Sequence, residues 1–370
     1  MAARKKPKDK DVPDDKEKAT AARARRVSLM KAIEAKRGGR LLISYITSTR
    51  PGFEFQIADD VLPFIHQCLE AGKARAATGV DLFIHSNGGS GTAPWRIVNL
   101  IREYTKDFAV LVPHHAFSAA TLIALGADKI IMHKMGCLGP IDPSVTNPFN
   151  PPHPQNPGQL IPISVEDVSA YFTLIKEDIG VQHEDELIQA VIALTEKIHP
   201  LALGNVQRSH HQSRMIAKKL LKKHMPRPEQ EHEIEQLVED LKSNLFFHGH
   251  PINRAEARDD LKLKVEDAPA TLEPLMWSLY EEYAGDLQID ERFITTHEWE
   301  IRQPAPPAPP AAPAPMVRIE SAKGAYLEAV NQSNVFLIDL TIERTKINTP
   351  FGPQDATKQE MLWQRWHPQP

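Results

Sequence analysis

The sequence predicts an α/β fold in which parallel strands are covered by helices, and three observations support this prediction. Short apolar runs alternate along the chain with segments of helical periodicity. The runs are continuous rather than alternating, which is typical of parallel strands buried on both faces. Two of them stop at turn-forming residues, Asn87-Gly88-Gly89 and Pro113. Functional residues are therefore expected at the carboxyl ends of these strands.

The expected elements follow one another closely in the first half of the chain. Gly38-Gly39 ends the first helix and Gly72 the second. Ser164, followed by Glu166-Asp167, resembles a capping box that opens a further helix. Helices are expected over 27–37, 57–74, 92–105, 118–127, 183–198, 203–224 and 228–243, and strands over 40–48, 79–86, 108–113 and 128–133.

Composition limits the class of protein. The chain has 370 residues, 41% hydrophobic and 25% charged, with a net charge of -4, so no basic field draws it to nucleic acid. No apolar run is long enough to span a membrane, and the charged N-terminus lacks the apolar segment of a secretory signal. The two cysteines, Cys68 and Cys137, are too few for a disulfide scaffold or a four-cysteine zinc site. A cytoplasmic location is therefore expected.

Proline and charge mark the expected domain organisation. Lys and Arg alternate with Asp and Glu at the N-terminus, where little is apolar, so a charged arm that is disordered or a frayed helix is expected. Two stretches concentrate the proline, one with six prolines and one with seven prolines and five alanines. The predicted organisation is an arm over 1–26, a main domain over 27–302 with a proline-rich loop at 146–162 and a helical segment at 183–243, a polyproline linker over 303–315, and a C-terminal appendage over 316–370.

Two turns carry the residue types that acyl transfer needs. Gly88 and Gly89 follow a predicted buried strand, where paired glycines leave backbone N–H groups able to bind an oxyanion. Such a pair also serves purely steric needs in many turns. Ser118 stands between a strand and a helix of small residues, beside the N–H of Ala119. This position suits a nucleophile, and it equally suits a serine that only caps the helix.

The order of these motifs resembles that of a known family. HSNGG, then HAFSAATLIALGADKIIM, then LGPIDP follow the pattern of the serine dehydrogenase proteinases, which are Clp-fold serine peptidases related to signal peptide peptidase A and the Clp protease proteolytic subunit. LFFHGHPINRAEARDDLKLKV, at 245–265, is similar to the closing strand and helix of the family. The resemblance covers about residues 27–270. It implies a Clp/crotonase-like ββα spiral, here with a helical insertion and a C-terminal appendage.

The resemblance assigns Ser118 as the nucleophile, and the backbone amides of Gly88, Gly89 and Ala119 as the oxyanion hole. Clp-fold relatives use either a histidine or a lysine as the general base, and each type has one candidate here. His133 ends the strand that follows the nucleophile helix.

Lys176 lies on the helix after the proline-rich loop, and a lysine there must lose its proton near neutral pH to act as a base. Asp240 is the predicted acidic partner of a histidine base, with Asp142 as the alternative. The choice between the two bases stays open at this point.

The implied function is ATP-independent hydrolysis of protein or peptide substrates through an acyl-enzyme on Ser118, by a homo-oligomer without a cofactor. No nucleotide-binding motif follows a strand. The pairs His114-His115 and His210-His211 lack the spacing of known metal-ligand motifs, so no metal site is expected. The alternatives are a non-catalytic Clp-fold scaffold and a crotonase-like enzyme acting on acyl thioesters.

Overall fold

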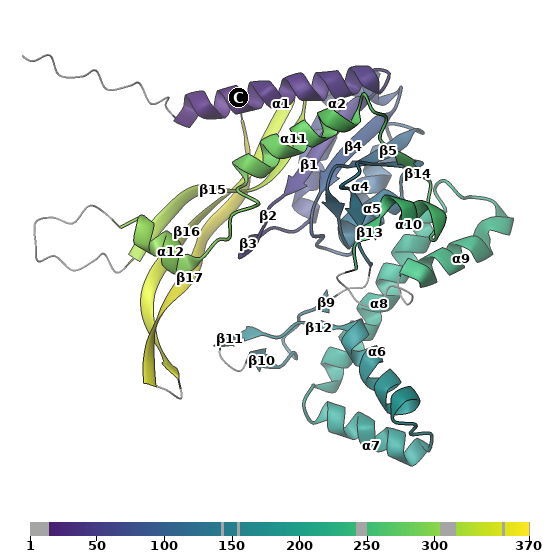
Figure 1. Cartoon of the computed structure of the whole chain (residues 1–370), viewed down its shortest axis with the longest axis vertical. Helices are drawn as coiled ribbons and strands as arrows, with labels where there is room; N and C mark the ends of the chain where they lie inside the picture. Colours follow the sequence, from purple (N-terminus) through teal and green to yellow (C-terminus); the bar gives the residue numbers. More distant parts are fainter. Residues whose placement is uncertain are drawn as a thin grey trace, which may run out of the picture.

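A mixed sheet of eight strands forms the centre of the molecule (Figure 1). The structure, a computed structural model, describes residues 15–141, 144–153, 156–241, 250–303, 316–349 and 352–369. The order across the sheet is β14-β7-β5-β4-β1-β15-β16-β17. These strands are β1 (Leu41–Thr47), β4 (Val80–His85), β5 (Phe108–Val112), β7 (Lys129–Met132), β14 (Val265–Asp267), β15 (Met316–Ala329), β16 (Gln332–Thr349) and β17 (Gly352–Pro368).

One half of the sheet is parallel, which confirms the predicted α/β class. β1, β4, β5, β7 and β14 all run in the same direction. Every residue of β1, β4 and β5 is buried, as their continuous apolar sequences predict. The carboxyl ends of β4 and β5 therefore meet at one edge of the sheet.

Helices cover both faces of the parallel strands. Side chains alternate along a strand, so Leu82 and Ile84 of β4 point to one core and Phe83 points to the other. On the Phe83 side pack α1 (Asp15–Lys36) and α11 (Glu273–Asp286). On the opposite side pack α2 (Leu62–Ala71), α4 (Ala93–Arg102), α5 (Ala119–Leu125) and the C-terminal half of α8 (Pro200–Leu221).

A smaller helical lobe extends from the sheet on α8 (Figure 1). Ala202 and Val206 of α8 pack there with Ile163 and Val165, apart from the main core. The lobe contains α6 (Val165–Thr173), its π-helical continuation Leu174–Asp178, and α7 (Glu184–Thr195), while α9 (Glu231–Glu239) packs on the other end of α8. The Ser164 side chain accepts a hydrogen bond of 2.9 Å from the N–H of Asp167, so the predicted N-cap of α6 is confirmed.

Short elements complete the described chain. A three-stranded sheet, β13-β8-β6, lies at the carboxyl ends of the main strands. The predicted proline-rich loop contains the β10–β11 hairpin. The predicted polyproline stretch lies outside the described residues. The short elements are β2 (Thr49–Arg50), β3 (Phe53–Glu54), α3 (Lys73–Ala76), β6 (His115–Ala116), β8 (Cys137–Leu138), β9 (Ser144–Val145), β10 (Pro152–His153), β11 (Asn156–Leu160), β12 (Ile163–Ser164), β13 (Ile252–Asn253), α10 (Arg254–Asp259), α12 (Thr295–Ile301), and the 3-10 helices Asp59–Val61 and Pro228–Gln230.

The C-terminal strands extend the main sheet. β15 pairs antiparallel with β1, and Ser44 lies opposite Glu328. The segment predicted as an appendage thus shares its hydrogen bonds with the first strand of the fold. The reason is apolar burial, because Tyr326 and Leu327 of β15 are fully buried against the two cores.

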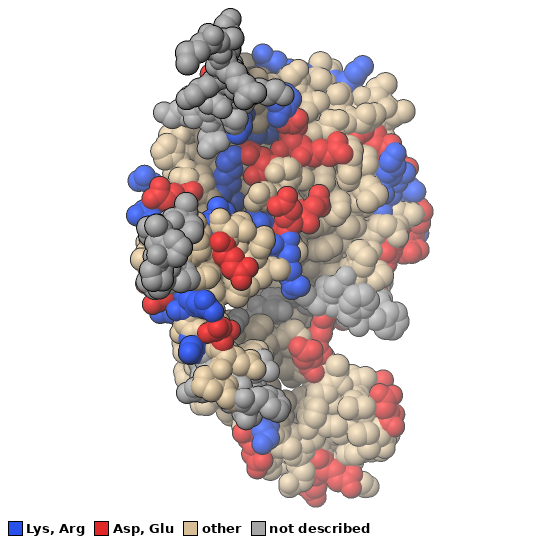
Figure 2. Space-filling model, turned by 60° about the vertical axis from the view of Figure 1, so that its left-hand side comes forward, with Lys and Arg blue, Asp and Glu red and all other residues tan. Residues whose placement is uncertain are grey.

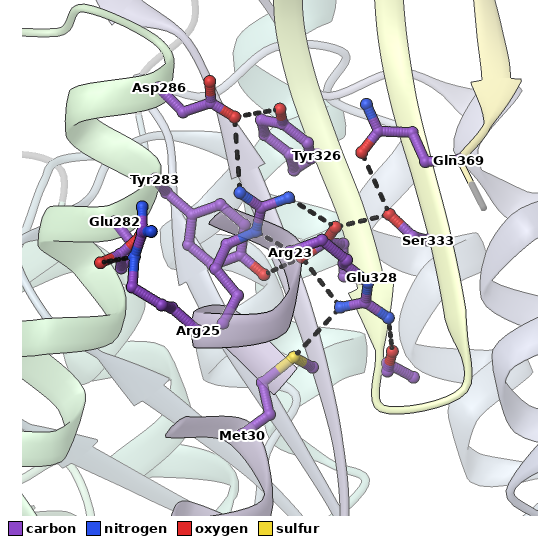
Figure 3. Close-up of polar contacts among 12 residues, drawn as sticks. Arg23, Arg25, Met30, Glu282, Tyr283, Asp286, Tyr326, Glu328, Ser333 and Gln369 are labelled. Carbon is purple, nitrogen blue, oxygen red and sulfur yellow. Dashed lines mark hydrogen bonds and ion pairs between the residues drawn. The ribbon is translucent and has the colours of Figure 1, made fainter. Parts of the chain in front are cut away.

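The N-terminal helix begins earlier than the sequence predicts. α1 starts at Asp15, so the later part of the expected charged arm is helical. Its arginines reach a carboxylate that is 0% exposed, that of Glu328 in β15 (Figure 3). The Arg26 guanidinium donates to both Glu328 oxygens at 2.9 and 3.0 Å, and Arg23 lies 3.3 Å away. The charged composition of this segment predicted an arm exposed to solvent. In the structure, the ion pairs of Arg23 and Arg26 with the buried Glu328 hold the helix against the sheet.

Aromatic rings and a second acid complete this cluster. The Tyr283 hydroxyl donates to Glu328 at 2.8 Å, and Asp286 lies 3.4 Å from Arg26. The Arg26 guanidinium carbon is 4.6 Å from the ring centre of Tyr326. Burial raises the pKa of Glu328, but the hydrogen bonds and charge of Arg26 outweigh burial and hold that pKa below its usual range. Glu328 is therefore ionised in the folded protein.

The surface carries both signs of charge. Over the upper part of the face in Figure 2, Lys and Arg side chains lie among Asp and Glu side chains. In the part of the chain that the structure describes, no helix has both the length and the apolar character needed to cross a membrane.

Replacing Glu328 with glutamine is expected to destabilise the protein, because the variant leaves the Arg26 charge buried without its main partner. We expect the free energy of unfolding in urea to fall by about 3 kcal/mol, the usual cost of breaking a buried pair. The matched control is Glu282→Gln, which removes a 2.8 Å pair with Arg25 at a site where Arg25 is 59% exposed. The control should leave the urea midpoint essentially unchanged.

At acidic pH the wild-type protein and Glu328→Gln should have nearly the same free energy of unfolding. The pKa of Glu328 is lower in the folded than in the unfolded protein, so its stabilisation is present above the unfolded value of about 4.3. It is lost as the pH falls through the lower, folded value. An equal gap between the wild-type protein and Glu328→Gln at pH 7 and at pH 3 would contradict the pairing.

Candidate functional site

A cavity of about 490 Å³ lies beyond the carboxyl ends of β4 and β5. Polar groups dominate its lining, and they come from the turn after β4, the start of α5 and the middle of α8. The lining residues are Gln56, Asn87, Gly89, Ser90, Gly91, Thr92, Ser118, Leu122, Ile141, Thr146, Ser209, Gln212 and Ser213. This is the edge of the sheet where the sequence predicts functional residues.

The turn after β4 is fixed by a buried hydroxyl. Ser86 is 0% exposed, and its Oγ accepts hydrogen bonds from the Thr47 hydroxyl at 2.8 Å and from the Gly88 N–H at 3.0 Å. The Gly88 carbonyl in turn accepts from the Ile57 N–H at 2.8 Å. The Gly88 N–H therefore binds Ser86, which leaves the neighbouring Gly89 N–H as the amide of this turn beside the cavity.

Neither glycine of the turn leaves room for a side chain, because neighbouring atoms lie too close. Gly88 has φ +109°, and a Cβ at that position would lie 2.7 Å from the Cβ of Ser118. Gly89 has φ +154°, and a Cβ there would lie 2.3 Å from the carbonyl oxygen of Ile57. Only glycine adopts these conformations without strain. The pair thus lets the turn and the start of α5 lie directly against each other.

Ser118 has an unusual backbone conformation for a residue that is not glycine. Its φ is +51° and its ψ is -112°. It precedes α5, but its side chain makes no capping hydrogen bond among the described residues. An N-cap serine has extended backbone and binds an N–H of the first turn. The geometry therefore does not fit a simple cap, and residues held in such strained conformations cluster at functional sites.

The far wall of the cavity comes from α8. Ser209, Gln212 and Ser213 face it from the middle of that helix, and the Ser213 hydroxyl donates to the Ile141 carbonyl at 2.7 Å. This bond ties α8 to the Gly139-Pro140 turn. These residues follow Ser118 by about ninety positions, so the motifs around Ser118 did not point to them. The only local signal was the run of polar residues on a predicted helix.

His133 lies on the other side of the sheet. Its side chain is 3% exposed and stacks on Trp277 of α11, with ring centres 5.1 Å apart. Its Nδ1 accepts from the N–H of Met135 at 3.1 Å. Burial lowers the pKa of His133. Ser118 opens α5, which packs on the opposite core, so the structure does not bring this predicted base to the cavity.

The other predicted polar residues also lie away from Ser118. Lys176 is exposed on the π-helical turn of the helical lobe. Asp240 follows α9 and accepts from the Gln236 amide at 2.9 Å, beside Asp260 and Lys262. Asp142 is outside the described residues. Among the described residues that line the cavity, none has a titratable side chain.

The first part of the chain matches a known family. Residues 15–196 match the family described as ClpP-like SDH-type serine proteinase. The matched region contains β1, β4, β5, the glycine turn and α5 with Ser118.

Curated relatives share a short stretch of sequence. Two uncharacterized proteins of Methanocaldococcus jannaschii are 46% and 42% identical to this chain over 66 residues. Each match covers 18% of this chain and 23% of the relative. A solved structure of a serine-to-alanine mutant of the membrane-bound stomatin-specific protease 1510-N aligns with 61% of this chain and 79% of its own, at 15% identity and a TM-score of 0.34.

Substituting alanine for Gly88 is expected to disturb the cavity, because the new Cβ would collide with Ser118 and strain the backbone at φ +109°. We expect the free energy of unfolding to fall by about 2 kcal/mol or more. Gly91→Ala is the matched control in the same loop, since a Cβ there meets nothing within 4 Å. Equal stabilities of the two variants in urea would contradict the close approach of the turn and α5.

Proposed function

Since residues 15–196 belong to the ClpP-like SDH-type serine proteinase family, we propose that the protein hydrolyses peptide bonds with Ser118 as nucleophile. The observation that carries this proposal is the geometry of Ser118. Ser118 lines a polar cavity, its backbone is strained at φ +51°, and Gly88 leaves empty the space beside Ser118 that a side chain in the β4 turn would fill. A serine that only capped α5 would need none of these features.

In this proposal Ser118 Oγ attacks the carbonyl carbon of the scissile peptide, and a base takes the hydroxyl proton. The tetrahedral oxyanion is bound by the N–H groups of Gly89 and Ala119. The Gly88 N–H is not used, since Ser86 accepts it; Gly88 instead supplies the space beside Ser118. Collapse of the intermediate expels the amine and leaves an acyl-enzyme, which water then hydrolyses.

The lining of the cavity supports a peptide as the substrate class. Gln56, Asn87 and Gln212 offer side-chain amides, which both donate and accept hydrogen bonds, as the peptide backbone requires. Leu122 and Ile141 supply the apolar part of the lining. Such a surface holds an extended peptide by its main chain and places few demands on its side chains.

A non-catalytic scaffold with the same fold is the second candidate function. The observation that favours it is the absence of a titratable side chain among the described residues that line the cavity. Without a base in reach, a serine hydroxyl is a weak nucleophile. Chemical reactivity of Ser118 therefore separates the two functions.

Ser118→Ala is expected to abolish covalent labelling of the protein by a fluorophosphonate probe, because the probe reports an activated serine and the variant removes it. The matched control is Ser209→Ala, which removes another hydroxyl from the same cavity. We expect the control to label within a few-fold of wild type, as measured by intact-protein mass spectrometry. A wild-type protein that stays unlabelled, or a Ser118→Ala variant that still reacts, would favour the scaffold.

The same probe tests the two predicted bases. In the conformation described here neither His133 nor Lys176 lies in the cavity, so we expect His133→Gln and Lys176→Gln to label within a few-fold of wild type. A loss of about a hundredfold or more in one variant would identify that residue as the base. Hydrolysis of an unstructured protein such as casein is then measured for the wild-type protein and the same variants. This assay connects labelling with turnover.

We further infer a homo-oligomer, supported by apolar side chains on α7. Ile188, Val191 and Ile192 are 53%, 42% and 45% exposed, and their spacing puts them on one face of the helix. Exposed apolar surface of this kind is typical of interaction sites. A second copy of the chain, presenting the same face, would bury it in a symmetric contact.

Ile188→Glu is expected to lower the oligomer mass in size-exclusion chromatography with light scattering, because a charge at the centre of the contact must be desolvated. Ile301→Glu provides the control, since Ile301 is equally exposed, at 58%, on a different helix. A mass that both variants leave unchanged, or one equal to a single chain for the wild-type protein, would exclude this contact.

A further inference from the structure

Three histidines converge beside the cavity. His85 is the last residue of β4, while His114 and His115 follow β5, and the potential ligand atoms of all three lie within 4.8 Å of one another. The sheet explains why they meet: β4 and β5 are parallel neighbours, so their carboxyl ends lie side by side. His85 and His115 are 30 positions apart in the chain. This separation is why adjacent-histidine spacing in the sequence gave no sign of a site.

The hydrogen bonds of His115 orient its ring. Its Nε2 lies 2.9 Å from the side-chain oxygen of Asn87, which can only accept, so Nε2 carries the hydrogen. The lone pair of the neutral ring is then on Nδ1. That atom lies 2.8 Å from Nδ1 of His114, so the two rings point their Nδ1 atoms at each other. In the absence of an ion, a proton on His114 bridges this pair.

His85 is the third and most buried histidine of the cluster. Its ring is 0% exposed, and Nε2 lies 3.1 Å from the Thr49 hydroxyl, which can accept its hydrogen. Its Nδ1 accepts a hydrogen bond of 3.4 Å from the backbone N–H of His115. A histidine that binds a metal usually donates its second ring N–H to an oxygen, which fixes the ring. Thr49 and Asn87 provide that oxygen for two of the three histidines.

Packing holds the three rings in place. His114 stacks on Tyr280 at 5.2 Å with the planes 8° apart, and His115 stacks on Phe117 at 4.6 Å. Burial lowers the pKa of His85 well below its usual value and that of His115 to about 3. The rings are therefore neutral at pH 7, the protonation state in which imidazole donates a lone pair to a metal.

We propose that His85, His114 and His115 bind one Zn²⁺ ion through their Nδ1 atoms. Zinc–nitrogen bonds of about 2.0–2.1 Å in a tetrahedral site place ligand nitrogens about 3.4 Å apart. The pair at 2.8 Å must then open by a few tenths of an ångström, and His85 Nδ1 must exchange the His115 N–H for the ion as it moves toward the other two rings. Three imidazole ligands suit zinc, and water takes the fourth position.

The ion would also fix one wall of the cavity. Asn87 lines the cavity and holds His115 by the same side-chain oxygen. Zinc on Nδ1 makes the Nε2–H a stronger donor and locks the Asn87 amide in one orientation. The site is independent of the proposed peptidase chemistry, since it uses neither Ser118 nor the oxyanion amides. Its test therefore does not depend on catalytic activity.

Calorimetric titration of the full chain with Zn²⁺, after treatment with a chelator and buffer exchange, tests the site. We expect saturation at one equivalent, and the intense visible absorption of four-coordinate Co²⁺ when Co²⁺ replaces zinc. His114→Gln and His115→Gln should each weaken binding at least a hundredfold. Thr49→Val keeps all three ligands but removes the acceptor for His85, and should weaken binding about 10- to 100-fold.

The matched control is His211→Gln, which removes a histidine from the other adjacent pair, on α8. It should bind Zn²⁺ as the wild-type protein does. Unfolding temperatures measured with chelator present should agree among all variants, which separates loss of a ligand from loss of the fold. Absence of a one-equivalent site in the wild-type protein, or undiminished binding by His114→Gln and His115→Gln, overturns the proposal.

Discussion

The architecture depends on a single buried carboxylate, that of Glu328. It receives two hydrogen bonds from Arg26 and one from Tyr283, so it joins the N-terminal helix, the α11 helix and a C-terminal strand at one point. A charge that is 0% exposed must be paired, and each partner here holds a different part of the chain. The parallel half of the sheet is therefore closed by a segment that the sequence places far from it.

The glycine turn and Ser118 show how this rigid sheet supports a strained site. β4 delivers the turn and β5 delivers Ser118, and both strands are fully buried. A residue held at φ +51° costs about 1–3 kcal/mol, which the surrounding packing must offset. The same two strand ends also bring His85 to His115. One edge of the sheet thus carries both proposed sites, and the Asn87 side chain lies between them.

Local signals predicted the parallel half of the fold well. The buried strands β1, β4, β5 and β7 are continuous apolar runs. The place of Ser118 after β5 suited a nucleophile or a helix cap, and only the family resemblance favoured the nucleophile. Contacts between segments far apart in the chain could not be predicted from local patterns. No residue in the N-terminal segment indicates that Arg26 has a buried partner, and nothing local relates β15 to β1 or α8 to the cavity. The charge pattern therefore suggested a solvated arm, where the structure has a helix.

The position of β15 also has a consequence for synthesis. Arg26 and Glu328 are 302 residues apart, so a ribosome adding 5–20 residues per second needs about 15–60 s between them. During that time β1 can pair with β4 on one side only, and its other edge is open to wrong partners. The edge of β1 that β15 covers in the folded protein is therefore open until translation is almost finished.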